Sequence, residues 1–101
     1  MKTDLTRPGP TEGVLGDAAE LGNVVAARRR TLGLTLGDAA GRLGVAATAL
    51  HRLEHGQGGM SVARVLTTLQ SLGIDLVART RDGGPLWTPA AAAQRVRPKH
   101  R

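Results

Sequence analysis

The chain has 101 residues, a formal net charge of +6 and no cysteine. One small domain of this length has little core to spare for a large catalytic cavity, and no stretch approaches the roughly 18 consecutive apolar residues that span a membrane. Without cysteine, disulfides and thiolate zinc sites are excluded. We therefore expect a cytoplasmic protein that is not an enzyme and that holds neither a cofactor nor a metal.

The positive charge is concentrated in the middle and at the end of the chain. Residues 19–81 carry eight arginines and four acidic residues, and residues 82–101 carry four basic residues and one aspartate. This distribution favours a nucleic-acid partner, although membrane surfaces and acidic proteins attract the same charge. Trp87 is the only aromatic residue, which argues against a platform on which single-stranded bases stack.

The first part of the chain predicts an arm followed by a helix. Residues 1–16 contain two prolines, three glycines and no periodic apolar pattern, so we expect a flexible arm. Residues 18–32 have the period of a helix, and one face of it collects Leu21, Val24, Val25, Arg28 and Leu32. The arginines at positions 28–30 cover more than one helical face. At least one of them must therefore turn inward or lie along the surface.

Residues 35–56 predict two short helices joined by a tight turn at Gly44 and Val45. Thr35 is expected to cap the first helix, with Asp38 three residues later. The second helix covers residues 46–55, buries Leu50 and Leu53, and ends at Gly56 in a left-handed conformation. Two helices joined by a short glycine-containing turn form the helix-turn-helix pattern. The second helix is then expected to enter the major groove of DNA.

A further helix is predicted over residues 62–72. Ser61 is its expected N-cap, and Gly73 closes it. Its expected apolar stripe consists of Val62, Val65, Leu66, Leu69 and Leu72. Four helices of this size can together enclose one small core, so we expect a helix-turn-helix domain at residues 17–82.

Residues 74–81 change to an alternating pattern that predicts a strand. The side chains expected to support it are Ile74, Leu76, Val77 and Ala78. A lone strand leaves backbone donors and acceptors unpaired. Antiparallel pairing with the same strand of a second copy would satisfy them. The alternative is an extended segment packed on its own helices.

Residues 83–101 predict a basic and largely disordered tail. Residues 90–96 are long enough for one or two helical turns, which would be a fifth helix, but need a partner to be ordered. Trp87 either packs on the domain surface or anchors a protein partner, since tryptophan is over-represented at binding hot spots.

Residues 19–80 resemble the lambda-repressor-like helix-turn-helix family, also called the Xre family. The matching positions occur in order and without gaps: Gly33-Leu34-Thr35, Ala39-Ala40, Gly44-Val45, Leu50, Leu53-Glu54 and Gly56. Within that family the layout is most like the HipB-type antitoxins, in which a strand follows a four-helix domain at once. The resemblance therefore implies an all-α fold, a homodimer joined through residues 74–81, and a HipA-like kinase toxin as partner.

The resemblance also implies which residues face DNA. The base-facing positions are Ala46, Ala47, Thr48, His51 and Arg52, and the backbone contacts are Thr35, Arg28, Arg42, Gln57 and Ser61. A pair between Arg29 and Glu54 is expected to tie the first helix to the end of the recognition helix. Three positions depart from the family: Leu36 replaces a usual glutamine, and alanines stand at 46 and 47 where serine and glutamine are frequent. We therefore expect DNA shape and arginine–phosphate contacts to carry much of the binding.

One motif points to a different chemistry. Residues 51–55 match H-x-x-E-H, the inverted zinc-protease motif. A catalytic zinc also needs a third protein ligand and a substrate cleft, and the sequence identifies neither. Glu54 moreover has a role opposite Arg29. No catalytic residue and no metal ligand are therefore assigned.

The function expected is sequence-specific binding to double-stranded DNA as a transcriptional repressor in the cytoplasm, at the nucleoid. The biological role most in keeping with the resemblance is the antitoxin of a HipBA-like pair, which binds its kinase toxin and represses its own operon. One alternative is a stand-alone Xre-family regulator without a toxin. The other is a protein-interaction module that has kept the fold and lost DNA binding.

Overall fold

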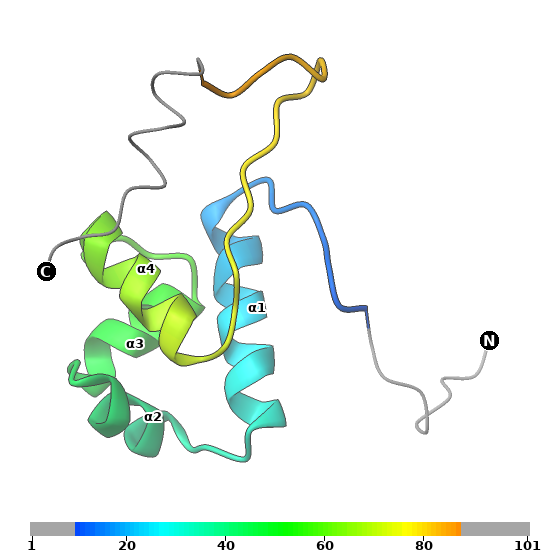
Figure 1. Cartoon of the computed structure of the whole chain (residues 1–101). Coiled ribbons are helices and arrows are strands. Elements are labelled where there is room, and N and C mark those ends of the chain that lie inside the picture. Colours follow the sequence, from blue (N-terminus) through cyan, green and yellow to red (C-terminus); the bar gives the residue numbers. More distant parts are fainter. Residues whose placement is uncertain (1–9, 88–101) are drawn as a thin grey trace, which may run out of the picture.

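The computed structural model describes residues 10–87, and this part of the chain contains four helices (Figure 1). They are α1 (Ala18–Thr31), α2 (Leu36–Leu43), α3 (Ala47–Glu54) and α4 (Val62–Ser71). The predicted helices are confirmed to within two residues at either end. The possible fifth helix at residues 90–96, residues 1–9 of the arm and most of the tail lie outside the described residues.

Three of the four helices begin with a side-chain cap. The hydroxyl of Thr35 accepts a hydrogen bond from the backbone N–H of Asp38 at 3.0 Å, and the hydroxyl of Ser61 accepts one from Arg64 at 3.1 Å. Asp17 caps α1 in the same way. Each cap satisfies one of the N–H groups that a helix start leaves unpaired. At α3 the N-cap is Ala46, which makes no such bond, as its methyl side chain requires.

A single apolar core lies between the helices. Its buried members are Val25, Ala39, Ala40, Leu50, Leu53, Leu69 and Leu72. The predicted stripes are wrong at three positions, because Leu32, Val62 and Leu66 are exposed. Leu32 is the C-cap residue that follows the last residue of α1. Helix α4 is rotated so that Thr68 rather than Leu66 faces inward.

Helices α1 and α3 approach each other with backbone against backbone. A Cβ atom added at Gly22 would lie 2.5 Å from the carbonyl oxygen of Glu54 and 2.6 Å from that of Leu53. Gly56 has the expected left-handed conformation (φ 71°), and a Cβ there would lie 2.8 Å from Cα of Ala19. Only glycine leaves room for this contact, which sets the distance between α1 and the C-terminal end of α3.

The segment after α4 is extended, and its outer end projects beyond the four helices (Figure 1). Its start is tied down where the N–H of Ile74 donates to the carbonyl of Leu69 at 2.8 Å. The strand predicted at residues 74–81 is wrong as a feature of the single chain, because residues 10–87 contain no strand. The physical reason is that a strand is defined by its partner, and this part of the chain supplies no second extended segment paired with it.

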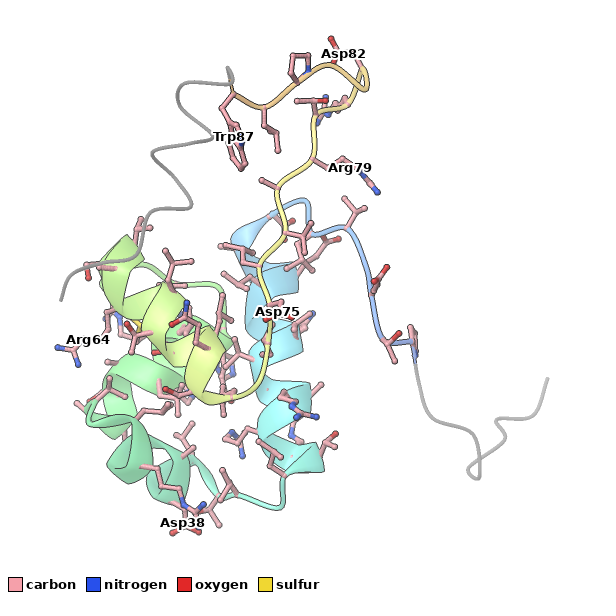
Figure 2. The ribbon with its side chains drawn as sticks, in the orientation of Figure 1. Asp38, Arg64, Asp75, Arg79, Asp82 and Trp87 are labelled. Carbon is pink, nitrogen blue, oxygen red and sulfur yellow. The ribbon has the colours of Figure 1, made fainter. Side chains whose placement is uncertain are left out.

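The extended segment ends in a turn at residues 80–84. The hydroxyl of Thr80 donates to the carbonyl of Gly84 at 2.7 Å, and the N–H of Gly84 donates to the Asp82 carboxylate at 2.9 Å. That backbone hydrogen bond, together with Thr80, lowers the pKa of the exposed Asp82 carboxyl below its usual value. Figure 2 shows Asp82 at the outer end of this segment, with Trp87 on the returning chain. Among the helices of residues 10–87, none has the length and apolar character needed to cross a bilayer.

Candidate nucleic-acid interface

The turn between α2 and α3 has the geometry of a helix-turn-helix unit. Gly44 is left-handed (φ 69°), and its N–H donates to the carbonyl of Gly41 at 3.3 Å. The N–H of Val45 donates to the carbonyl of Ala40 at 3.0 Å. These two bonds satisfy the last carbonyls of α2 and reverse the chain within two residues. The predicted turn at Gly44 and Val45 is therefore confirmed, and it holds α3 at a defined angle to α2.

The base-facing residues expected from the sequence lie on one exposed side of α3. Leu50 and Leu53 bury the opposite side in the core. All five of the expected positions are exposed: Ala46, Ala47, Thr48, His51 and Arg52. The structure therefore brings them together on a single accessible surface, which we call the α3 face. Only Thr48, His51 and Arg52 bring polar atoms to it.

Arg52 differs from the other members of the α3 face. Its Nε donates to the carbonyl of Gly58 at 3.3 Å, and a Cβ at Gly59 would lie 3.6 Å from the same nitrogen. The side chain therefore lies over the loop at residues 57–59 instead of extending from the helix. The N–H of Gln57 also donates to the carbonyl of Arg52 at 2.8 Å. Residue 52 and the loop are thus one local unit.

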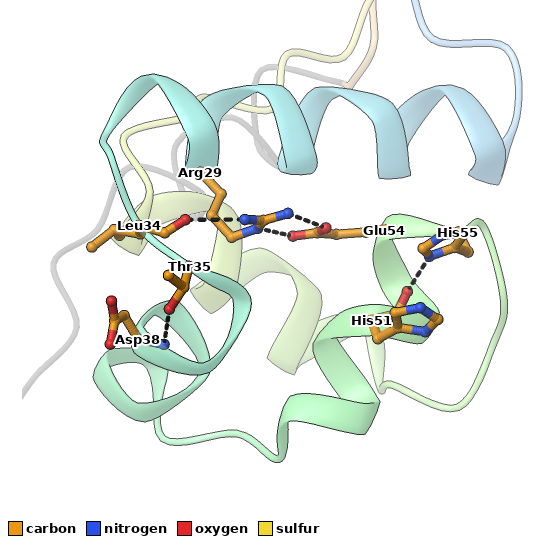
Figure 3. Close-up of polar contacts among 7 residues, drawn as sticks. All are labelled: Arg29, Leu34, Thr35, Asp38, His51, Glu54 and His55. Carbon is orange, nitrogen blue, oxygen red and sulfur yellow. Dashed lines mark hydrogen bonds and ion pairs between the residues drawn. The ribbon is translucent and has the colours of Figure 1, made fainter.

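Two histidines stack at the C-terminal end of α3 (Figure 3). The ring centroids of His51 and His55 are 4.1 Å apart and the ring planes differ by 28°. Nδ1 of His55 lies 2.8 Å from the carbonyl oxygen of His51. His51 belongs to the base-facing set predicted from the sequence, whereas no role was predicted for His55. The spacing of four residues on a helix was the signal that places both rings on one side.

Arg29 of α1 and Glu54 at the end of α3 form an ion pair (Figure 3). Arg29 Nε donates to Oε2 of Glu54 at 2.6 Å, and Nη2 donates to Oε1 at 2.9 Å. Nη1 of the same arginine donates to the carbonyl of Leu34 at 3.0 Å. The hydrogen bond to Glu54 raises the pKa of Arg29 above its usual value, against a smaller opposing effect of burial. The pair expected from the resemblance is thus present, and one guanidinium joins α1, the end of α3 and the segment leading to α2.

The expected backbone contacts occupy different positions. Thr35, Arg42, Gln57 and Ser61 are all exposed. Thr35 and Ser61 lie at helix N-termini, where free N–H groups and the helix dipole favour a phosphate. Arg28 also makes a contact within the domain: its Nε donates to the carbonyl of Leu72 at 2.8 Å. It therefore ties α1 to the C-terminal end of α4, with Nε engaged inside the domain.

Arg64 is a cation of this region that was not among the residues predicted from the sequence. It is exposed in the first turn of α4, and Figure 2 shows its side chain pointing away from the helices. Its Nη1 lies 3.4 Å from the carbonyl oxygen of Gly44, in the turn between α2 and α3. Its position three residues after the Ser61 cap was the available signal, because it places Arg64 at the start of a helix beside the turn.

Comparison with known proteins identifies the domain. Within residues 10–87, no group of three or more histidine, aspartate or glutamate side chains is gathered closely enough to hold a metal ion. A search of curated proteins finds no match. The family model described as "Helix-turn-helix domain" matches residues 20–81, which is more than half of the chain. With the turn, the exposed α3 face and the buried ion pair already in place, this match shows that the chain belongs to the helix-turn-helix domain family of DNA-binding proteins.

Proposed function

We propose that this protein is a transcriptional repressor that binds a specific sequence of double-stranded DNA through the α3 face. The observation that carries the proposal is that α3 is buried on one side by Leu50 and Leu53 and exposed along the other. The bidentate pair of Arg29 and Glu54 fixes the orientation of the helix. A rigid helix exposed in this way fits the major groove, which is wide enough to admit an α-helix.

The residues of the α3 face divide into two roles. Thr48 and His51 extend from the helix and are assigned to base edges, and the methyl groups of Ala46 and Ala47 suit contacts with thymine. Arg52 is assigned to a phosphate, because its Nε is engaged by Gly58 and its guanidinium lies at the loop. The helix starts at Thr35 and Ser61, and the side chains of Arg42, Gln57 and Arg64, supply further backbone contacts.

The homodimer proposed for this repressor pairs residues 74–81 of two copies as antiparallel strands. Within residues 10–87, the backbone groups of residues 75–79 form no hydrogen bond with other backbone groups. The side chain of Val77 is 81% exposed and that of Leu76 is 59% exposed, while Ile74 packs against the core and Ala78 is exposed. A second copy would pair the backbone and cover Leu76 and Val77. Two α3 helices would then read half-sites of an imperfect palindrome, about 34 Å or one DNA turn apart.

The role as antitoxin of a HipA-like kinase toxin is the finer proposal, and it is supported by the resemblance to HipB-type antitoxins. Trp87, 42% exposed, is the proposed anchor for that partner, because a tryptophan at an interface buries a large area at low entropic cost. The stand-alone regulator shares every DNA-binding feature. A pull-down from the native host that returns no kinase, with an adjacent gene that encodes none, would favour it.

The protein-interaction module is favoured by one observation, the low polarity of the α3 face and its uncapped start at Ala46. An electrophoretic mobility-shift assay with the DNA upstream of the chain's own gene decides between the repressor and the protein-interaction module. We expect a sequence-dependent shift whose affinity falls steeply with salt, because Arg and Lys contacts release counterions. The matched control is a fragment of equal length with shuffled sequence. Equal binding to both fragments, or no shift at low salt, would reject the repressor.

A further inference from the structure

We propose that His51 and His55 form a binding site for a divalent transition-metal ion on the DNA-facing side of α3, and that the metal and DNA compete. The metal site stands on the geometry of the two histidines alone. The competition rests on the proposed function, because it requires that the α3 face contact DNA.

The two histidines have the helical spacing of a chelating pair. They are four residues apart, and the N–H of His55 donates to the carbonyl of His51 at 3.1 Å, so the helical backbone continues through the second histidine. The ring centroids are 4.1 Å apart. Two histidines at this spacing on one helix can bind the same zinc ion. In this stacked arrangement the in-plane lone pairs of the two rings do not point at one position. The His51 ring must therefore rotate to share an ion with His55 at ligand bonds of about 2.0–2.1 Å.

The hydrogen bond of His55 prepares its ring for a metal. With Nδ1 2.8 Å from the carbonyl oxygen of His51, Nδ1 carries the proton and donates it, since a carbonyl oxygen can only accept. The lone pair is then on Nε2, to which no residue within 10–87 hydrogen-bonds. Metal-binding histidines characteristically donate the other ring N–H to a carbonyl or carboxylate, which fixes the tautomer and the ring orientation. Neither ring nitrogen of His51 hydrogen-bonds to another residue in the part of the chain that the structure describes.

The surroundings select the class of metal. His55 shares an open cleft with Asn23, Arg30 and Glu54, and the carboxylate of Glu54 is already occupied by Arg29. Arg30 and Arg52 add positive charge nearby, and the described residues that line this cleft offer no free carboxylate to a hard cation such as Ca²⁺ or Mg²⁺. Neutral imidazole ligands suit Cu²⁺, Ni²⁺ and Zn²⁺. Two protein ligands leave the remaining positions to water, which distinguishes this site from a catalytic zinc centre with three.

A bound metal would interfere with DNA at the α3 face. His51 belongs to the set assigned to base edges, and it cannot coordinate a metal and contact a base with the same ring. A hydrated ion on that side would also hold the C-terminal half of α3 away from the groove. By linkage, DNA must lower the affinity for the metal by the same factor by which the metal lowers the affinity for DNA.

The site itself is tested without DNA, by calorimetric titration of the full chain with Cu²⁺. We expect one ion per chain. His51→Gln and His55→Gln should each bind the ion at least about tenfold more weakly, because the loss even of a group that only supports a metal ligand lowers metal affinity by that much. The control is His100→Gln, which removes the third histidine of the chain and should leave binding unchanged. The affinities should follow the order in which Cu²⁺ exceeds Ni²⁺ and Zn²⁺. Binding that is lost with His100, or that survives His51→Gln and His55→Gln, would overturn the site.

Competition is tested by the mobility shift with and without Ni²⁺. The wild-type chain should bind its DNA at least about tenfold more weakly when the metal site is filled, and His55→Gln, which keeps His51, should be insensitive to the metal. Equal loss of DNA binding in the wild type and in His55→Gln would overturn the competition. A chain that binds metal but no DNA would reject the proposed function and leave the metal site standing.

Discussion

Arg29 and Glu54 lie 25 residues apart and form a bidentate salt bridge, with side chains that are 12% and 4% exposed. This pair joins α1 to the last residue of α3 and also reaches the carbonyl of Leu34. A guanidinium with three of its donors used in this way cannot be replaced by a lysine, whose compact ammonium lacks the planar fork. Helix α3 is therefore anchored at its C-terminal end by an ion pair that lies behind the α3 face.

Removing one member of this pair should destabilise the domain. Glu54→Gln leaves the Arg29 guanidinium without its counter-charge in a site of low exposure, and we expect a loss of about 3 kcal/mol in the free energy of unfolding, the usual cost of breaking a buried pair. Urea denaturation monitored by circular dichroism measures it. The control is Asp75→Asn, which neutralises an exposed acidic residue and should change stability by less than about 0.5 kcal/mol. A change of similar size in the two variants would contradict this role of the pair.

The pair should also resist alkaline pH. The pKa of Arg29 is raised in the folded state, so the stabilisation linked to it is fully present below the unfolded-state pKa. It is lost only as pH rises through the still higher folded value. Between pH 7 and pH 10, the difference in unfolding free energy between the wild type and Glu54→Gln should therefore stay constant. A difference that shrinks over this range would show that the guanidinium loses its charge earlier than the structure implies.

Two glycine-to-alanine substitutions should change the stability of the domain in opposite directions, because Gly22 lies in the contact between α1 and α3 and Gly41 does not. Gly22→Ala places a methyl group against the carbonyls of Leu53 and Glu54, and the forced backbone shift should cost about 1–3 kcal/mol or more. Gly41→Ala, in α2, meets no atom within 4 Å and should stabilise the protein by about 0.5–1 kcal/mol, because alanine favours the helix. Thermal unfolding of both variants measures the two signs. Equal effects would mean that helix propensity alone decides at residue 22.

The two roles within the α3 face are separable by DNA binding. Arg52→Gln should weaken binding to all sequences alike and reduce the salt slope by about one counterion, as expected for a phosphate contact. Thr48→Ala should leave the salt slope unchanged and relax the preference for the operator over a shuffled sequence. Fluorescence anisotropy at several salt concentrations measures both quantities. A loss of sequence preference in Arg52→Gln would indicate that Arg52 contacts base edges and not a phosphate.

The proposed strand pairing depends on the backbone of residues 74–81. Val77→Pro removes a backbone N–H and cannot take part in a strand ladder, so it should convert the dimer to a monomer. The side chain of Val77 is 81% exposed in the single chain, so the helical domain itself should keep its stability. Val77→Ala retains the N–H and should remain dimeric. Sedimentation equilibrium distinguishes these outcomes, and a dimer of Val77→Pro with undiminished association would refute pairing through this segment.

The features that the sequence by itself determined are those that depend on near neighbours in the chain. The caps at Thr35 and Ser61, the left-handed turns at Gly44 and Gly56, and the buried Leu50 and Leu53 all follow from interactions between residues one to four positions apart. They were sufficient to predict four helices and a helix-turn-helix unit. The pairing of Arg29 with Glu54 was also expected, although through resemblance to a family and not through any local pattern.

Contacts between helices were decided only by the tertiary structure. Three consecutive arginines can be recognised in the sequence, but their partners depend on the packing of α1 against its neighbours: Arg28 reaches Leu72, Arg29 reaches Glu54, and Arg30 lines a cleft with His55. The clash that reserves residue 22 for glycine likewise exists only at the observed distance between α1 and α3. At residues 74–81 the alternating pattern is suited to a strand, but a strand needs a second extended segment as hydrogen-bonding partner. Residues 10–87 of one chain provide no such segment. Local sequence sets the conformation of a segment, whereas the geometry of packing sets what that segment can touch.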